Sequence, residues 1–147
     1  MRHNSSILIF IVLTSCIFVG CKQQSVDGVI ISNGLYDMQT FSTNRELCSI
    51  IKRTLNKDPH ALVELNNYWC GGGAGCYDLG FVVTQIIYKV GEKEFINLVQ
   101  GLSKKEKQGL LSLIGAGLEY GDNNHDGKMD DTTIEVAFPS LNKALNE

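Results

Sequence analysis

Between residue 42 and the C-terminus, apolar residues recur every three to four positions, the spacing that puts them on one face of an α-helix. Five segments share this pattern, and glycine, proline or capping residues separate them. Their apolar faces consist of Leu47, Ile50, Ile51 and Leu55; Leu62, Leu65, Tyr68 and Trp69; Leu79, Val82, Val83, Ile86, Ile87 and Val90; Phe95, Leu98, Val99 and Leu102; and Leu110, Leu111, Leu113, Ile114 and Leu118. The pattern predicts an all-α domain over residues 42–147.

Residues that satisfy the free backbone groups of a first helical turn mark where these helices begin. Ser42 or Thr43 is predicted to cap the first helix, and Asp58-Pro59 gives the second a cap followed by proline at its first position. Ser103 precedes Glu106 by three residues, which predicts a capping box for the fifth helix.

Two architectures fit five to six short helices joined by short loops. The helical hairpins resemble the helix pairs of HEAT and armadillo repeats, but no fixed repeat period is visible, and an irregular bundle fits equally well. Residues 132–147 predict a last, weaker helix around Pro139. Gly109, Gly115 and Gly117 would be costly within the fifth helix unless they allow close contact with a neighbouring helix.

The N-terminus has a different pattern. Arg2 and His3 precede an apolar run over residues 7–19, which has the length of a signal-peptide core and is short for a membrane span. The run ends in Val19-Gly20-Cys21 and turns polar at once. This resembles the lipobox of bacterial lipoproteins, which implies cleavage of residues 1–20 and lipidation of Cys21. Cys16 also fits the pattern, but cleavage there would leave apolar residues at the mature start.

The lipobox resemblance implies a lipid-anchored protein of the bacterial cell envelope. In Gram-negative lipoproteins, a lysine directly after the lipidated cysteine usually accompanies sorting to the outer membrane, and Lys22 follows Cys21. We therefore expect the domain to face the periplasm. Residues 21–41 are expected to form a lipidated tether, either irregular or with a short hairpin around the turn dipeptide Asn33-Gly34.

The mature chain would have 127 residues, enough for one domain with a core. Loss of Arg2 leaves twelve basic residues against sixteen acidic ones, a net charge of −4. The basic residues are scattered along the chain. Both the sign and the distribution of charge therefore disfavour nucleic acid as a partner.

Three cysteines remain beyond Cys21, and export to an oxidising compartment predicts a disulfide among them. Cys70 and Cys76 flank a glycine-rich bend and are the preferred pair, while Cys48 paired with either one is the alternative. A zinc site is not expected, because no histidine lies at ligand spacing from these cysteines.

Oxygen-bearing side chains alternate along the segment that follows the fifth helix. Asp122, Asn124 and Asp126 are followed by Gly127, Lys128 and Asp130. The segment resembles the first nine positions of the EF-hand loop and of dockerin loops, which implies a calcium site. The implied ligands are Asp122, Asn124, Asp126, the Lys128 carbonyl and Asp130.

The resemblance ends before the last position of the loop. Thr133 stands where an EF-hand has a bidentate glutamate, so Asp130, Asp131, Glu135 or water would supply that oxygen. No second loop is present to pair with this one. A polar turn without calcium is the alternative interpretation, and a single site would be structural rather than a sensor.

The bend at Gly71-Gly72-Gly73 is expected to join two helices rather than to bind a nucleotide, because no strand precedes it and no Gly-Lys-Ser/Thr ending follows. Tyr68, Trp69 and Tyr77 around it could form a semi-exposed aromatic patch. Such residues are frequent hot spots of protein binding.

The sequence holds no catalytic constellation. Cys48 or Cys76 with His60 has no local support as a nucleophile and base, and there is no serine elbow motif. In size, export and helical content the chain looks like periplasmic immunity or inhibitor proteins, which implies a non-enzymatic binding lipoprotein whose partner is a protein, such as a secreted toxin. The alternative is a structural envelope lipoprotein that a calcium loop stabilises.

Overall fold

The computed structural model describes residues 25–147; the expected signal peptide and Cys21 lie outside these residues. The described part of the chain is all-α, which confirms the predicted fold class. Its long helices are α3 (Phe41–Leu55), α5 (Ala74–Val90) and α7 (Lys104–Tyr120). The shorter elements are β1 (Ser25–Val26), β2 (Val29–Ile30), α2 (Asn33–Tyr36), α4 (Pro59–Asn66), α6 (Glu92–Val99), α8 (Ile134–Ala137) and α9 (Pro139–Asn146).

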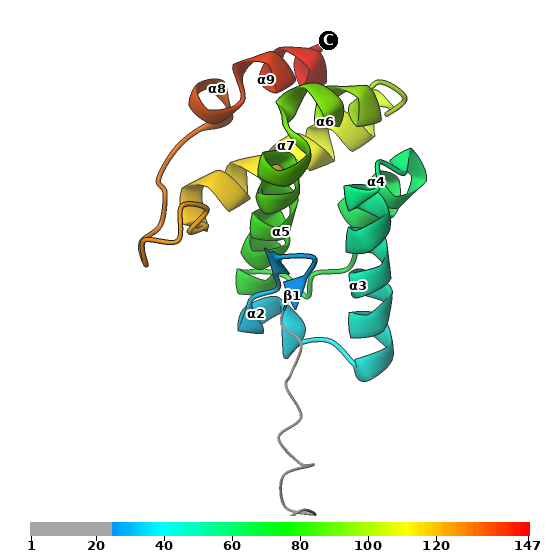
Figure 1. Cartoon of the computed structure of the whole chain (residues 1–147), viewed down its shortest axis with the longest axis vertical. Helices are drawn as coiled ribbons and strands as arrows, with labels where there is room; N and C mark the ends of the chain where they lie inside the picture. The colour runs from blue at the N-terminus through cyan, green and yellow to red at the C-terminus, as the bar shows by residue number, and fades with distance from the viewer. Residues whose placement is uncertain (1–24) are drawn as a thin grey trace, which may run out of the picture.

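Helix α5 runs through the middle of the domain (Figure 1). It packs most extensively against α7, while α3 and α4 form an antiparallel pair beside it. Helices α6 and α9 cover one end, where the C-terminus lies, and the β1–β2 hairpin and α2 lie at the other. The main helix pair, α5 and α7, is not consecutive in sequence, because α6 lies between them along the chain.

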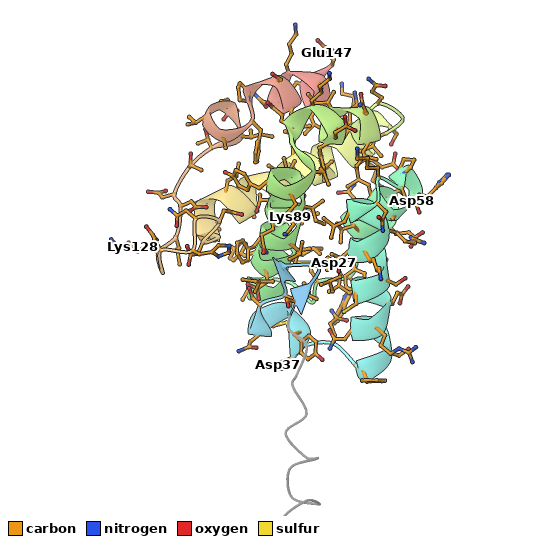
Figure 2. All side chains as sticks on the ribbon, in the orientation of Figure 1. Asp27, Asp37, Asp58, Lys89, Lys128 and Glu147 are labelled. Atoms are coloured by element: carbon orange, nitrogen blue, oxygen red, sulfur yellow. A yellow bond between two sulfur atoms is a disulfide. The ribbon has the colours of Figure 1, made fainter. Side chains whose placement is uncertain are left out.

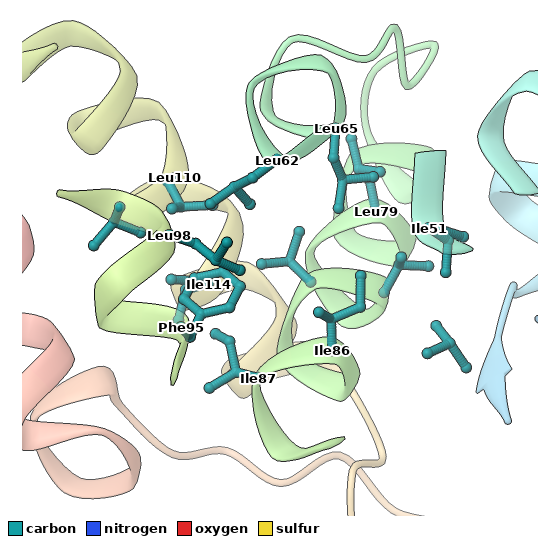
Figure 3. Packing of buried hydrophobic residues seen from close by; sticks show 14 of the residues in the cluster. Ile51, Leu62, Leu65, Leu79, Ile86, Ile87, Phe95, Leu98, Leu110 and Ile114 are labelled. Carbon is teal, nitrogen blue, oxygen red and sulfur yellow. The ribbon is translucent and has the colours of Figure 1, made fainter. Parts of the chain in front are cut away.

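One continuous apolar core joins these elements (Figure 3). Its largest fully buried side chains come from the β2–α2 region and from helices α3 to α7. They are Ile31, Leu35, Leu47, Ile51, Leu62, Leu65, Leu79, Ile86, Ile87, Phe95, Leu110 and Ile114. The apolar face predicted for each of the five helical segments therefore supplies residues to the core.

The helix starts follow the predicted capping residues with one shift. Asp58 accepts a hydrogen bond from the His60 N–H ahead of Pro59, as predicted, and Ser103 and Glu106 form the predicted capping box. The first helix instead begins at Phe41, and its cap is Thr40, whose hydroxyl accepts from the Thr43 N–H. Thr43 is thus a partner of the cap and lies within the first turn.

The predicted hairpin around Asn33-Gly34 is wrong. The turn lies at Asp27-Gly28, where both residues have positive φ (48° and 79°), as a two-residue type I′ turn requires. The strands pair Ser25 with Ile30 and Val26 with Val29. Asn33 and Gly34 instead begin α2, because the Asp78 carboxylate accepts a hydrogen bond from the Leu35 N–H at 2.8 Å. That contact spans 43 residues, and no local pattern shows it.

Residues 25–36 belong to the folded domain rather than to a tether. Val29 and Leu35 have no exposed surface, and Ile31 is 1% exposed. The Gln85 side chain on α5 accepts from the Ile30 N–H and donates to its carbonyl oxygen, as a neighbouring strand would. The folded domain therefore includes residues 25–36, which lie before the boundary at residue 42 expected from helical periodicity.

Candidate functional site

The loop with the calcium-like pattern projects from the end of α7. Gly121 ends the helix, and residues 121–133 lead to α8 (Figure 1). Lys128 lies at the outer edge of this loop and points away from the domain (Figure 2). Residues 124–129 are all exposed, so a bound ion would be in contact with water.

Side-chain oxygens in the loop turn toward its own backbone N–H groups. Asp122 Oδ1 and Asn124 Oδ1 both accept from the Asp126 N–H, each at 2.9 Å. Asp122 Oδ2 accepts from the Gly127 N–H, and Asp126 Oδ1 accepts from the Lys128 N–H. The oxygens of Asp122 and Asn124 therefore converge on one point inside the turn.

Asp130, a ligand expected from the sequence, also makes hydrogen bonds within the loop. Its Oδ2 accepts from both the backbone N–H and the side-chain amide of Asn123, while its own N–H donates to the Gly121 carbonyl. Asn123 in turn accepts from the Thr84 hydroxyl at 2.8 Å and so attaches the loop to α5. The sequence pattern singled out alternate positions and missed Asn123, which lies between them.

The loop offers oxygen ligands, which calcium prefers, but its side chains alone do not supply all the oxygens that calcium requires. Calcium takes six to eight oxygens, and a carboxylate with two hydrogen bonds still has lone pairs free for a metal. Across residues 25–147, no three His, Cys, Asp or Glu side chains gather closely enough to hold a metal ion. A calcium ion in this arrangement would depend on the Asn124 amide, the Lys128 carbonyl and water beside Asp122, Asp126 and Asp130.

The cysteines are arranged as preferred from the sequence. Cys70 and Cys76 form a disulfide that closes the bend between α4 and α5, and Cys48 is a free, half-buried thiol on α3. Burial raises the pKa of the Cys48 thiol, which disfavours the thiolate that a nucleophile requires. Cys76 has no free thiol, so neither cysteine is suited to pair with His60 as a nucleophile.

The three aromatic residues near the bend have different surroundings. The Tyr68 hydroxyl donates to the Thr43 carbonyl at 2.9 Å, and the residue packs against the core. Trp69 is 67% exposed, and its carbonyl accepts from the Gln39 side chain. Tyr77 stacks on Tyr120 with ring centroids 4.5 Å apart. Tyr68 is thus mainly structural, while Trp69 and Tyr77 remain exposed to possible partners.

Other exposed apolar residues adjoin the expected aromatic patch, one at the end of α7 and two near the start of α3. Tyr120, at the end of α7, completes the pair with Tyr77 and is 41% exposed. Met38, on the link from α2 to α3, and Phe41, the first residue of α3, are 48% and 77% exposed. The sequence gives no periodic signal for these residues, because their exposure depends on which helix face the neighbouring elements leave uncovered.

Comparison with protein-family models, with curated proteins and with solved structures gives no match. Within residues 25–147, none of the helices has the length and apolar character needed to cross a bilayer.

Proposed function

We propose that the chain is a lipid-anchored, non-enzymatic protein of the bacterial envelope that binds another protein. The observation that carries this proposal is the stacked pair Tyr77–Tyr120, two residues that remain 45% and 41% exposed. The two residues lie on the two most extensively packed helices, α5 and α7, so the pair is held in place before any partner arrives. Rigid, half-exposed aromatic residues supply binding energy at a small cost in conformational entropy.

The surroundings of the pair indicate the chemistry of the partner. A hydrogen bond with Glu119 raises the pKa of the Tyr120 hydroxyl, and the nearby charge of Asp131 acts in the same direction. Acidic groups therefore adjoin the aromatic pair, and the mature chain as a whole carries a charge of −4. We propose a partner with a complementary basic surface, such as a secreted toxin that an immunity protein neutralises.

Affinity capture tests this proposal. The mature chain, immobilised through its C-terminus in detergent, is offered envelope and secreted fractions at low and high salt. We expect one protein at one-to-one stoichiometry, retained better at low salt. The double variant Tyr77→Ala/Tyr120→Ala should weaken binding by at least about 2 kcal/mol, roughly thirtyfold in Kd.

Val136→Ala is the matched control, because Val136 is 75% exposed on α8, outside the proposed contact. Equal retention by the double variant and the control would exclude the tyrosine pair as the contact. If neither fraction yields a partner, the binding role fails and the structural envelope lipoprotein becomes the better proposal.

Calcium in the 122–130 loop is a separate proposal, supported by the converging oxygens of Asp122 and Asn124. Calcium at a hundred times its dissociation constant should raise the unfolding free energy by about 2.7 kcal/mol, because it binds only the folded loop. Thermal melts in calcium and in chelator measure this difference. It should vanish in Asp126→Ala and persist in Glu46→Ala, an exposed acid on α3; equal melting temperatures of the parent chain under both conditions would show a polar turn without calcium.

A further inference from the structure

Two exposed apolar side chains, Met38 and Trp69, lie together where the α2–α3 link meets the bend before α5, and a third, Phe41, begins α3 close by in the sequence. A Cβ added at Gly71 would lie 2.9 Å from Met38 Sδ and 3.6 Å from the Trp69 ring, so both side chains flank this glycine. Phe41 follows three residues after Met38, at the first position of α3. We call Met38, Phe41 and Trp69 the apolar end patch; they are 48%, 77% and 67% exposed.

Hydrogen bonds between neighbouring segments hold the backbone of this patch in place. The Gln39 side chain donates to the Trp69 carbonyl at 3.0 Å and joins the α2–α3 link to the bend. Buried Asn44 donates to the Tyr36 carbonyl at 2.9 Å and joins α3 to the end of α2. Because the Cys70–Cys76 disulfide also closes the bend, the apolar side chains project from a fixed backbone.

The patch lies at the end of the domain where the described chain begins. Strand β1, helix α2 and the start of α3 are all at this end, opposite α6, α9 and the C-terminus (Figure 1). Asp37, the residue before Met38, is at the lower edge of the domain in Figure 2. The α2–α3 link therefore lies at the end of the domain that an anchor at Cys21 would hold.

The length of chain before Ser25 limits how far the domain can move from an anchor at Cys21. Three residues, 22–24, lie between the two positions, and the four Cα–Cα steps that join them span at most about 14 Å when fully extended. A folded domain of this size has a radius of gyration of about 14 Å. The anchored domain therefore cannot turn its β1–α2 end far from the membrane.

We propose that the apolar end patch docks on the lipid bilayer that holds the lipidated Cys21, and that this contact fixes the orientation of the domain. The proposal rests on lipidation of Cys21 in the proposed function. Aromatic side chains such as Trp69 are favoured at the boundary between acyl chains and headgroups. The Arg45 guanidinium lies 5.9 Å from the centre of the Phe41 ring and would meet headgroup phosphates while Phe41 enters the apolar layer. The docked orientation leaves α6, α9 and the C-terminus farthest from the membrane.

Trp69 is the only tryptophan in the chain and so reports directly on the patch. The mature lipoprotein, purified from its host, is reconstituted into vesicles of phosphatidylethanolamine and phosphatidylglycerol. Compared with the same protein in a non-ionic detergent, Trp69 emission should shift to shorter wavelength in ordinary vesicles. In vesicles with brominated acyl chains, the bromine atoms should quench it.

The double variant Met38→Ser/Phe41→Ser should become severalfold more accessible to iodide in the water phase than the parent in vesicles. Val136→Ser, at an equally exposed apolar site away from the patch, should behave as the parent does. Matching thermal melts of the parent and both variants would exclude misfolding as the cause.

Mass spectrometry of the mature N-terminus separates the two proposals. An unmodified Cys21 would overturn the lipid anchor and the docking with it. A lipidated, vesicle-bound chain whose Trp69 stays open to iodide and is not quenched by brominated lipid would overturn the docking alone. Shielding from iodide that grows with protein density, without quenching by brominated lipid, would show that a second copy covers the patch and would also overturn the docking.

Discussion

At the scale of single residues, Gly80 and Gly117 determine how closely the two main helices pack. A Cβ at Gly117 would meet the Gly80 carbonyl oxygen, and a Cβ at Gly80 would meet the Leu113 carbonyl oxygen. Backbone lies against backbone at this crossing, so no flexible side chain can move aside. Of the three glycines in α7 that the sequence marks as costly, Gly117 is explained by this close contact.

Replacing Gly117 with alanine should destabilise the domain although alanine favours helices. Overpacking at a rigid contact costs about 1–3 kcal/mol or more. Gly115→Ala is the control on the same helix, since a Cβ there would meet no atom of another helix within 4 Å. That change should add up to about 1 kcal/mol through helix propensity. Urea unfolding of both variants measures the difference, and an equal response would contradict the close crossing.

Asp78 predicts a pH dependence of stability. Burial raises the pKa of its carboxyl group, although the hydrogen bond from the Leu35 N–H acts in the opposite direction. Between the ordinary and the raised pKa, the folded state therefore binds more protons than the unfolded state. The contribution of Asp78 to stability is present at low pH and is lost as the pH rises through this window.

Comparison of the parent with Asp78→Asn isolates this contribution, because asparagine keeps an oxygen acceptor for Leu35 and does not titrate in this range. The unfolding free energy of the parent minus that of the variant should fall as the pH rises from about 3 to about 7. Urea denaturation at several pH values measures it. A difference that increases with pH would show that hydrogen bonding, not burial, dominates the pKa.

At the scale of elements, the bend between α4 and α5 combines a covalent link with an unusual backbone. Gly71, Gly72 and Gly73 have φ of 75°, 87° and 52°, a region that residues with a Cβ rarely adopt. The disulfide joins Cα atoms 4.9 Å apart on either side of this glycine run. Three such residues in succession lose much conformational freedom on folding, and the disulfide reduces that loss by restricting the unfolded chain.

Removal of the disulfide in Cys70→Ser/Cys76→Ser should lower the unfolding free energy by about 2 kcal/mol, the chain-entropy expectation for so short a loop. Chemical denaturation with and without a reducing agent checks this value. The reductant should lower the stability of the parent chain to that of the variant and leave the variant unchanged. If the reductant has no effect on the parent, the link contributes little.

At the scale of the whole molecule, the number of residues between Cys21 and the described domain limits how a lipid anchor at Cys21 could hold the domain. Since residues 25–36 contribute to the core, only residues 22–24 would lie between a lipidated Cys21 and the described domain. Under the proposed lipidation, a segment of that length would keep one end of the domain near the membrane surface. The Tyr77–Tyr120 pair and the 122–130 loop would then act at a fixed distance from the bilayer rather than on a flexible stalk.

Two neighbouring isoleucines test whether this segment is part of the fold. Ile31 is 1% exposed, and Ile31→Ala should cost about 2–5 kcal/mol. Ile30 is 39% exposed, and Ile30→Ala should cost well under half as much. Thermal unfolding of the two variants gives the comparison. Near-zero effects of both changes would mean that the segment is a tether after all.

The sequence alone determined the local features, because each depends on neighbours within a few residues. Helical periodicity placed the core faces of α3 to α7, and the capping chemistry of Asp58 and Ser103 fixed two helix starts. The short separation of Cys70 and Cys76 predicted their disulfide. The alternating oxygens of residues 122–126 predicted a loop whose side chains turn inward.

Tertiary structure decided every feature that depends on contacts between distant segments. Asp78 makes a helix of Asn33-Gly34, Gln85 secures the β2 strand, and Gly80 meets Gly117, across separations of 37 to 55 residues. It also decided which aromatic residues stay exposed, since the neighbours of Tyr68 and Tyr77 come from other elements. Periodicity identifies the face of a helix that is apolar, but only the packed neighbours decide which part of that face is covered.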